Sequence, residues 1–109
     1  NVGHALETVV LNELERRAAD IGYVKTGDGL EVDFLARHRA GGEELIQVCA
    51  DPSAGDTLSR ELRALADAAQ EHPRAARRLL VLDRDALVPA PGVAVQPAYE
   101  WLLAEQRED

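Results

Sequence analysis

Four residues whose side chains can bind a metal or transfer a proton lie in segments predicted to form a helix and two neighbouring strands. Asp33 is part of "LEVDFLARH", and Gln47 and Cys49 stand two residues apart in "ELIQVCA". Glu7 belongs to the N-terminal segment. Carboxylates such as Glu7 and Asp33 can hold a divalent cation. For metal-assisted hydrolysis, a carboxylate would bind the metal better than neutral Gln47 does, and a cationic side chain would serve the reaction better than Cys49.

Glu7 is expected on a helix over residues 3–20. Apolar residues recur there at three- and four-residue steps, and Gly22 is expected to end the helix. Glu7 falls near the middle of the stripe formed by Leu11, Leu14 and Ala18, so its carboxylate should face the sheet. A buried carboxylate needs a partner, a metal or a proton. The alternative is a helix-end glutamate that reaches solvent or caps backbone N–H groups.

The rest of the chain predicts an α/β fold with a mixed sheet, a three-stranded antiparallel meander extended by parallel strands and flanked by helices. Turn signals at Gly27-Asp28-Gly29 and Arg39-Ala40-Gly41-Gly42 separate the strands of the meander. His72-Pro73 ends a second helix. The expected elements after the first helix are strands at 23–26, 30–38 and 44–50, a helix at 56–71, strands at 77–83 and 92–97, and a short helix in the tail at 98–109.

Side-chain alternation places Gln47 and Cys49 on the same face of their strand as Leu45. The simplest hairpin register puts both on the face that carries Asp33. Glutamine in the middle of a buried strand requires hydrogen-bond partners. The structural alternative to a chemical site is that Gln47 bonds to Glu7 or Asp33 while Cys49 packs as a small apolar residue.

Length and charge restrict the classes of function. The chain has 109 residues, which suits one domain, and its net charge of −8 opposes broad binding to a phosphate backbone. The basic residues Arg77 and Arg78 and the pair Arg16–Arg17 are interpreted as solvated surface. A lone cysteine forms no intramolecular disulfide, which favours a reducing cytoplasmic location. No apolar run is long enough for a membrane span, so no membrane partner is expected.

The sequence resembles the C-terminal domain of uncharacterised prokaryotic AAA-type ATPases, and more broadly the PD-(D/E)XK nuclease superfamily. The segments that carry the resemblance are "GHALETVVLNELERR", "TGDGLEVDFLA", "LIQVCAD" and "AYEWLL". The resemblance implies a restriction-endonuclease-like fold that follows a P-loop ATPase module. The chain begins with Asn1 and contains no Met, so residues 1–109 are expected to be one nuclease-like domain cut from a longer ATPase, although a trimmed tag would give the same start.

The resemblance also implies roles for individual residues. Glu7 matches the helix glutamate, and Asp33 matches the metal-binding aspartate. Gln47 stands where the motif has its acidic residue, and Cys49 stands where it has its lysine. Neutral Gln47 is a weak ligand for Mg²⁺, and Cys49 supplies no fixed cation.

Two residues could replace the missing lysine in space, namely Lys25 on the neighbouring strand and Arg60 on the following helix. In an active site, Glu7, Asp33 and Gln47 would hold Mg²⁺ or Mn²⁺, and Lys25 would serve catalysis. In an inactive domain no cofactor is expected.

Three hypotheses about function follow. The leading one is a catalytically inactive nuclease-like accessory domain that serves the ATPase module of its own chain in recognition or assembly. The second is a metal-dependent DNA endonuclease with a migrated Lys25. The third is a partner-binding domain whose hairpin edge or Trp101 helix docks another chain, which an exposed Trp101 would favour. Self-association and weak DNA binding are left open. Trp101 is expected to be at least partly buried against Leu102 or Leu103 and the strand at 92–97.

Overall fold

The computed structural model describes residues 1–104, and the last five residues of the predicted tail helix segment lie outside the described residues. The elements in chain order are α1 (Val2–Arg17), β1 (Ala18–Lys25), β2 (Glu31–His38), β3 (Glu43–Cys49), α2 (Thr57–Glu71), β4 (Ala76–Val81), the 3-10 helix η1 (Arg84–Ala86), β5 (Ala94–Pro97) and α3 (Ala98–Leu103).

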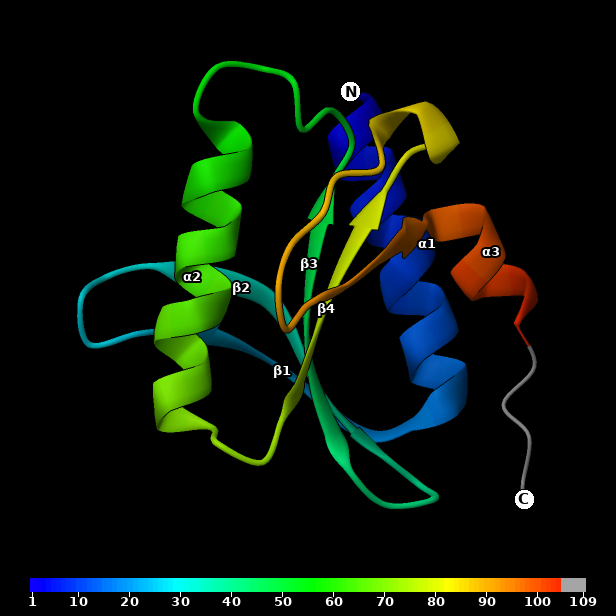
Figure 1. The fold of residues 1–109 in the computed structure, drawn as a ribbon. Helices are drawn as coiled ribbons and strands as arrows, with labels where there is room; N and C mark the ends of the chain where they lie inside the picture. The colour runs from blue at the N-terminus through cyan, green and yellow to red at the C-terminus, as the bar shows by residue number, and fades with distance from the viewer. Residues whose placement is uncertain (105–109) are drawn as a thin grey trace.

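The five strands form one mixed sheet in the order β1-β2-β3-β4-β5 (Figure 1). Strands β1, β2 and β3 are an antiparallel meander. Strand β4 then pairs in parallel with β3, and β5 pairs in parallel with β4. A parallel pair needs a crossover connection, and α2 supplies it between β3 and β4. The prediction of an α/β fold with a mixed sheet is therefore confirmed.

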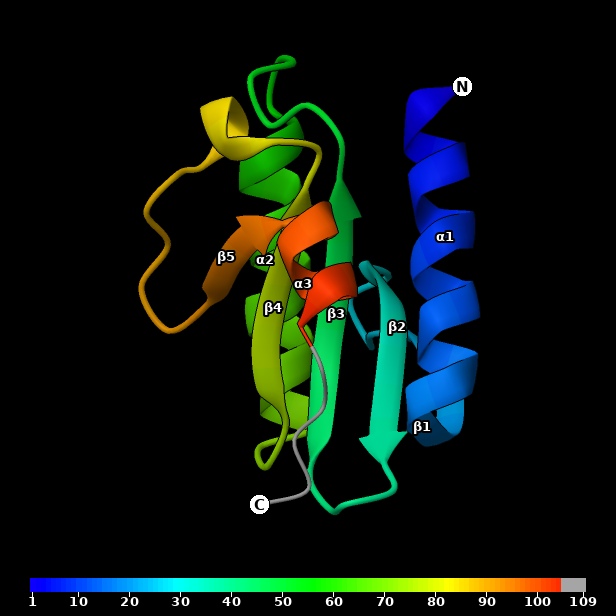
Figure 2. The ribbon, with the colours of Figure 1, turned by 90° about the vertical axis from the view of Figure 1, so that its right-hand side faces the viewer.

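Helices cover both faces of the sheet. Figures 1 and 2 show α2 on one face and α1 with α3 on the other. Leu65 and Ala68 of α2 are buried against Val32 and Leu45 of the meander. The opposite face is closed by a second cluster, in which Leu14 of α1 meets strand residues and α3. None of the helices within residues 1–104 is long and apolar enough to cross a membrane.

The first helix is shorter than the sequence predicts, and the first strand is longer. Helix α1 ends at Arg17, so the prediction of helix at 18–20 was wrong. Strand β1 begins at Ala18, and Gly22, expected to end the helix, lies inside the strand. Backbone pairing with β2, from Ala18↔His38 to Lys25↔Glu31, outweighs the local helix preference of the alanines.

The buried stripe of α1 also differs from the predicted one. Its buried residues are Val10, Leu14 and Arg17, whereas Leu11 is 37% exposed. The stripe is therefore rotated about the helix axis relative to the expected line through Leu11. Glu7 lies at the edge of the stripe and is half-buried.

Arg17 was expected on the solvated surface, and this prediction was wrong. Its guanidinium donates hydrogen bonds to the carbonyl oxygens of Trp101 at 2.8 Å and Ala104 at 3.0 Å. It lies 4.5 Å from the centroid of the Trp101 ring and also pairs with Glu13. These carbonyls end α3, where a cation is favoured by the helix dipole.

Trp101 is 5% exposed, as expected of an aromatic anchor near the end of a domain. It belongs to the buried cluster that includes Val10, Leu14 and Ala98, with Leu102 packed against the cluster. The cluster thus includes residues of α1, a contact that the sequence did not suggest. An exposed Trp101, the feature that would favour docking through this helix, is not present.

Candidate functional site

The backbone ladder between β2 and β3 does not extend to the first residues of β2. Paired residues run from Arg37↔Glu43 to Phe34↔Ile46. The start of β2, from Glu31 to Asp33, still lies beside β3, but side chains take over the hydrogen bonding there. A buried backbone N–H or C=O requires a partner, so this stretch depends on those side chains.

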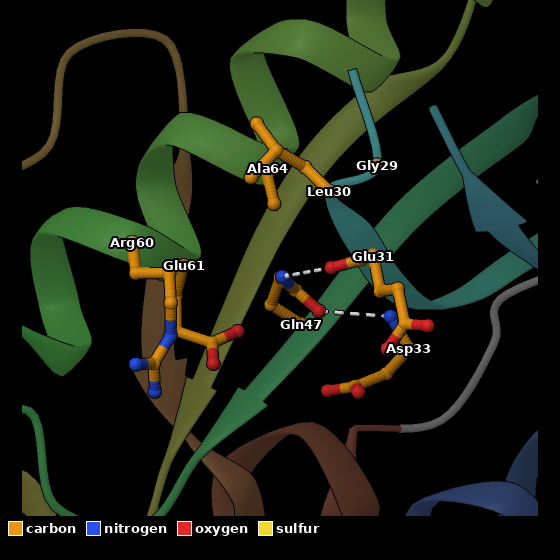
Figure 3. Close-up of a pocket in the computed structure, with 8 residues that line it drawn as sticks. All are labelled: Gly29, Leu30, Glu31, Asp33, Gln47, Arg60, Glu61 and Ala64. Carbon is orange, nitrogen blue, oxygen red and sulfur yellow. Dashed lines mark hydrogen bonds between the residues drawn. The ribbon is translucent and has the colours of Figure 1, made fainter. Parts of the chain in front are cut away.

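Gln47 supplies two of the replacement bonds. Its side-chain oxygen accepts from the backbone N–H of Asp33 at 2.8 Å, and its side-chain nitrogen donates to the carbonyl of Glu31 at 3.0 Å. Figure 3 shows the Gln47 amide lying between the two strands with both bonds directed at β2. Gln47 is 1% exposed. Its amide is therefore a structural bridge, as the structural alternative from the sequence anticipated.

Asp33 completes the bridge in the opposite direction. One of its carboxyl oxygens accepts a hydrogen bond from the backbone N–H of Val48 at 2.8 Å. Each strand therefore sends a side chain to the backbone of the other. Asp33 and Gln47 hold the two strands together beyond the end of the ladder.

Asp33 is coupled electrostatically to the carboxyl groups of Glu7 and Glu61. Burial, and then the negative charges of Glu7 and Glu61, raise the pKa of Asp33 to about 7, against the opposing effect of the Val48 N–H bond. A hydrogen bond with the Glu7 side chain acts in the same direction as burial. Burial likewise raises the pKa of Glu61, with Arg60 opposing and Glu7 adding to the rise. Glu7 comes from α1 and Glu61 from α2, so the site draws on both faces of the sheet.

A pocket of about 240 Å³ opens between β2 and α2 at this place (Figure 3). Asp33 and Gln47 line it from the strands, and Arg60, Glu61 and Ala64 line it from the helix. The remaining lining residues are Gly29, Leu30 and Glu31. The pocket is thus partly polar and contains Asp33 and Gln47, which the sequence singled out, but not Cys49.

Neither Lys25 nor Arg60 is well placed to supply the cation that an active site would need. Within the described part of the chain, Arg60 is the one basic residue that lines the pocket. Its side chain is 61% exposed and lies 4.0 Å from Asp56. Lys25 is exposed on β1, where its backbone lies opposite that of Glu31 in the sheet, and it does not line the pocket. The charges that act on Asp33 are those of Glu7 and Glu61, and both are negative.

Cys49, which the resemblance aligns with a lysine, packs as an apolar residue in this structure. It is 4% exposed and packs in a cluster with Leu79 and Val81, against Leu58 and Leu62 of α2. Burial raises the pKa of the Cys49 thiol, and the nearby Glu61 and Asp51 carboxylates raise it further. A neutral buried thiol is neither a nucleophile nor a cation.

The residues at the site do not fit the metal that the resemblance implies. The Gln47 oxygen is already bonded to the Asp33 N–H, and one Asp33 oxygen is bonded to Val48. Among residues 1–104, no group of three or more His, Cys, Asp or Glu residues is arranged to hold a metal ion. The chain's own residues therefore support no metal-assisted step at this place.

The structure brings together most of the residues that the sequence indicated. Asp33 and Gln47 are in contact, and Glu7 acts on Asp33. Glu61 was missed, although it lies three residues after Leu58 and four before Leu65, on the buried side of α2. That position is the signal that could have identified it.

The comparisons with known proteins give one family. No curated protein and no solved structure matches the chain. The sequence model of the family described as "Domain of unknown function (DUF4143)" matches residues 2–101, which include every element from α1 to Trp101 of α3. The chain belongs to this DUF4143 family.

Proposed function

We propose that this chain is a restriction-endonuclease-like domain that has lost catalysis and serves an ATPase, through the ATPase module of its parent protein, in recognition or assembly. The cytoplasmic location and the ATPase partner belong to the same proposal. They rest on the resemblance of four sequence segments, and the mixed sheet with its flanking helices is compatible with them.

The observation that carries the proposal is that the Gln47 side chain is engaged in hydrogen bonds to β2. Its oxygen and its nitrogen both bond to the backbone of β2, and the residue is almost fully buried. In a working nuclease the residue at this place would be a carboxylate free to bind the metal. In this chain Gln47 instead bonds to the backbone of the neighbouring strand.

The second half of the motif supports the same conclusion. Cleavage of a phosphodiester needs charge neutralisation at the phosphate and a positioned nucleophile. Cys49 is buried, and within residues 1–104 the pocket is lined by the acidic Glu31, Asp33 and Glu61 and by one basic residue, Arg60. A site of this charge repels a phosphate backbone, as does the net charge of −8.

The proposal is tested by incubating the purified chain with supercoiled plasmid and with branched DNA in millimolar Mg²⁺ or Mn²⁺. We expect both substrates to stay intact. Metal-dependent nicking that disappears in a Glu7→Ala/Asp33→Ala variant would show that the site is active and would overturn the proposal.

A further inference from the structure

A second pocket, of about 420 Å³, lies at the carboxyl ends of the parallel strands β3 and β4. The loops that leave these strands are near the upper end of the molecule in both Figure 1 and Figure 2. Its apolar lining is made by Ala50, Pro52, Leu82, Ala86 and Val88. Leu82 is 43% exposed. The carboxyl ends of strands are the usual place for ligands in open α/β sheets.

The same pocket is bordered by Asp51, Asp83 and Asp85. Asp51 accepts hydrogen bonds from the backbone N–H and the hydroxyl of Ser53, and these bonds lower the pKa of its carboxyl group. Asp83 accepts from the backbone N–H of Asp85 at 3.0 Å and so begins η1. The local turns therefore hold the Asp51 and Asp83 carboxylates in place.

These carboxylates have no ion-pair partner in residues 1–104. The nearest arginine in the sequence, Arg84, pairs instead with Glu100 of α3. The apolar part of the pocket is thus bordered by three carboxylates that form no ion pair within residues 1–104. Nucleic acid and anionic lipid would be repelled by such a border.

We propose that this pocket is a docking site for a protein segment that carries an apolar side chain flanked by lysine or arginine. The apolar side chain would fill the space beside Leu82 and Val88, and the basic residues would pair with Asp83 and Asp85. Surface complementarity of this kind governs encounter and partner choice more than affinity, so binding of an isolated peptide is expected to be weak.

This inference deepens the proposed function. It rests on one part of that function, the recognition of a protein partner. It does not depend on loss of catalysis. Failure of the peptide experiment below would leave the DNA-cleavage result unchanged, and a positive cleavage result would leave the docking site intact.

The test is a titration of the isotope-labelled chain, followed by backbone amide chemical shifts. The probe is a short blocked peptide of alternating lysine and leucine. Its matched controls replace every lysine by glutamate or every leucine by serine. The lysine–leucine peptide is expected to shift the amides of residues 50–53 and 82–88, whereas both control peptides should bind more weakly.

A charge-matched pair of variants makes the test specific. Asp83→Asn/Asp85→Asn removes two charges at the pocket, and asparagine at position 83 still caps η1. Asp20→Asn/Asp28→Asn removes two exposed charges elsewhere. The first variant is expected to weaken binding by about fivefold, as the loss of two surface ion pairs implies, and the second should bind nearly as the original chain does.

Several results would overturn the proposal. Equal weakening in both variants would mean general attraction to an acidic protein. Equal binding of spermidine would identify a small polyamine as the occupant, and equal binding of the lysine–serine peptide would remove the role of the apolar pocket. Shifts confined to other residues, or no shifts up to the solubility limit, would exclude the site.

Discussion

The backbone N–H of Asp33 donates a hydrogen bond of 2.8 Å to the side-chain oxygen of Gln47, at the point where the β2–β3 ladder has ended. This side-chain bond replaces a backbone–backbone hydrogen bond that the β2–β3 ladder lacks at this position. A second bond runs in the opposite direction: the backbone N–H of Val48 on β3 donates to the side-chain carboxyl of Asp33 on β2. Two residues that the sequence suggests for chemistry are thereby engaged in holding the sheet together.

Replacing Gln47 should therefore lower stability. Gln47→Ala leaves the Asp33 N–H and the Glu31 carbonyl without their side-chain partner. We expect the free energy of unfolding to fall by about 2 kcal/mol, the scale of buried polar groups left unpaired. Urea unfolding followed by Trp101 fluorescence measures this change. Gln70→Ala, at an exposed position of α2, is the control and should change little. Equal stability of Gln47→Ala and the original chain would contradict the bridging role.

Asp33 should make stability depend on pH. Its native pKa is about 7, whereas an aspartate in an unfolded chain has a pKa of about 3.9. Between these values the native state holds more protons than the unfolded state, so the free energy of unfolding should fall as pH rises from about 4 to 7. The slope from this one group is at most about 1.4 kcal/mol per pH unit. Above pH 7 its contribution should level off.

Asp33→Asn isolates that contribution because asparagine keeps an oxygen that can accept from the Val48 N–H. The variant should show a shallower fall with pH, and it should gain stability relative to the original chain above pH 7. A smaller slope should persist, since burial also raises the pKa of Glu61. Urea unfolding at several pH values is the measurement, with Asp28→Asn as an exposed control. An unchanged slope in Asp33→Asn would show that Asp33 is not the titrating group.

Arg17 should be the most sensitive arginine of α1. It is buried between Glu13 and the Trp101 ring and donates to the end of α3. Arg17→Ala is expected to lower the free energy of unfolding by about 2 to 4 kcal/mol and to shift Trp101 emission to the red. Arg16→Ala is the matched control, because the Arg16 side chain is 68% exposed. Equal effects of the two substitutions would mean that the α1–α3 contact is not held by Arg17.

Much of the fold was predictable because its signals are local. Turn residues marked the meander, and proline ended α2 at His72. The segment at 18–22 was misread because alanine favours helix locally, while pairing with β2 decides the outcome. Pairing partners are distant in sequence, so a local pattern does not contain them.

The site was predictable to the extent that it depends on alternation along strands. Asp33 and Gln47 were placed together for this reason. The contributions of Glu61 and Arg17 depend on which side of α2 meets the β2–β3 end and where α3 terminates. Both are tertiary relationships. A charged residue beside others in the sequence, such as Arg17 next to Arg16, gives no sign that it will be buried.

The most direct measurement of the central claim is the rate of plasmid nicking by the original chain in Mg²⁺ and in Mn²⁺. It is followed over hours beside the Glu7→Ala/Asp33→Ala variant, which removes two of the site's carboxyl groups. The account predicts no metal-dependent nicking by either protein, because Gln47 is held in the sheet and Cys49 supplies no cation. Nicking by both proteins would indicate a contaminant. Nicking by the original chain alone would contradict the account and make Lys25 and Arg60 the first residues to test for the missing cation.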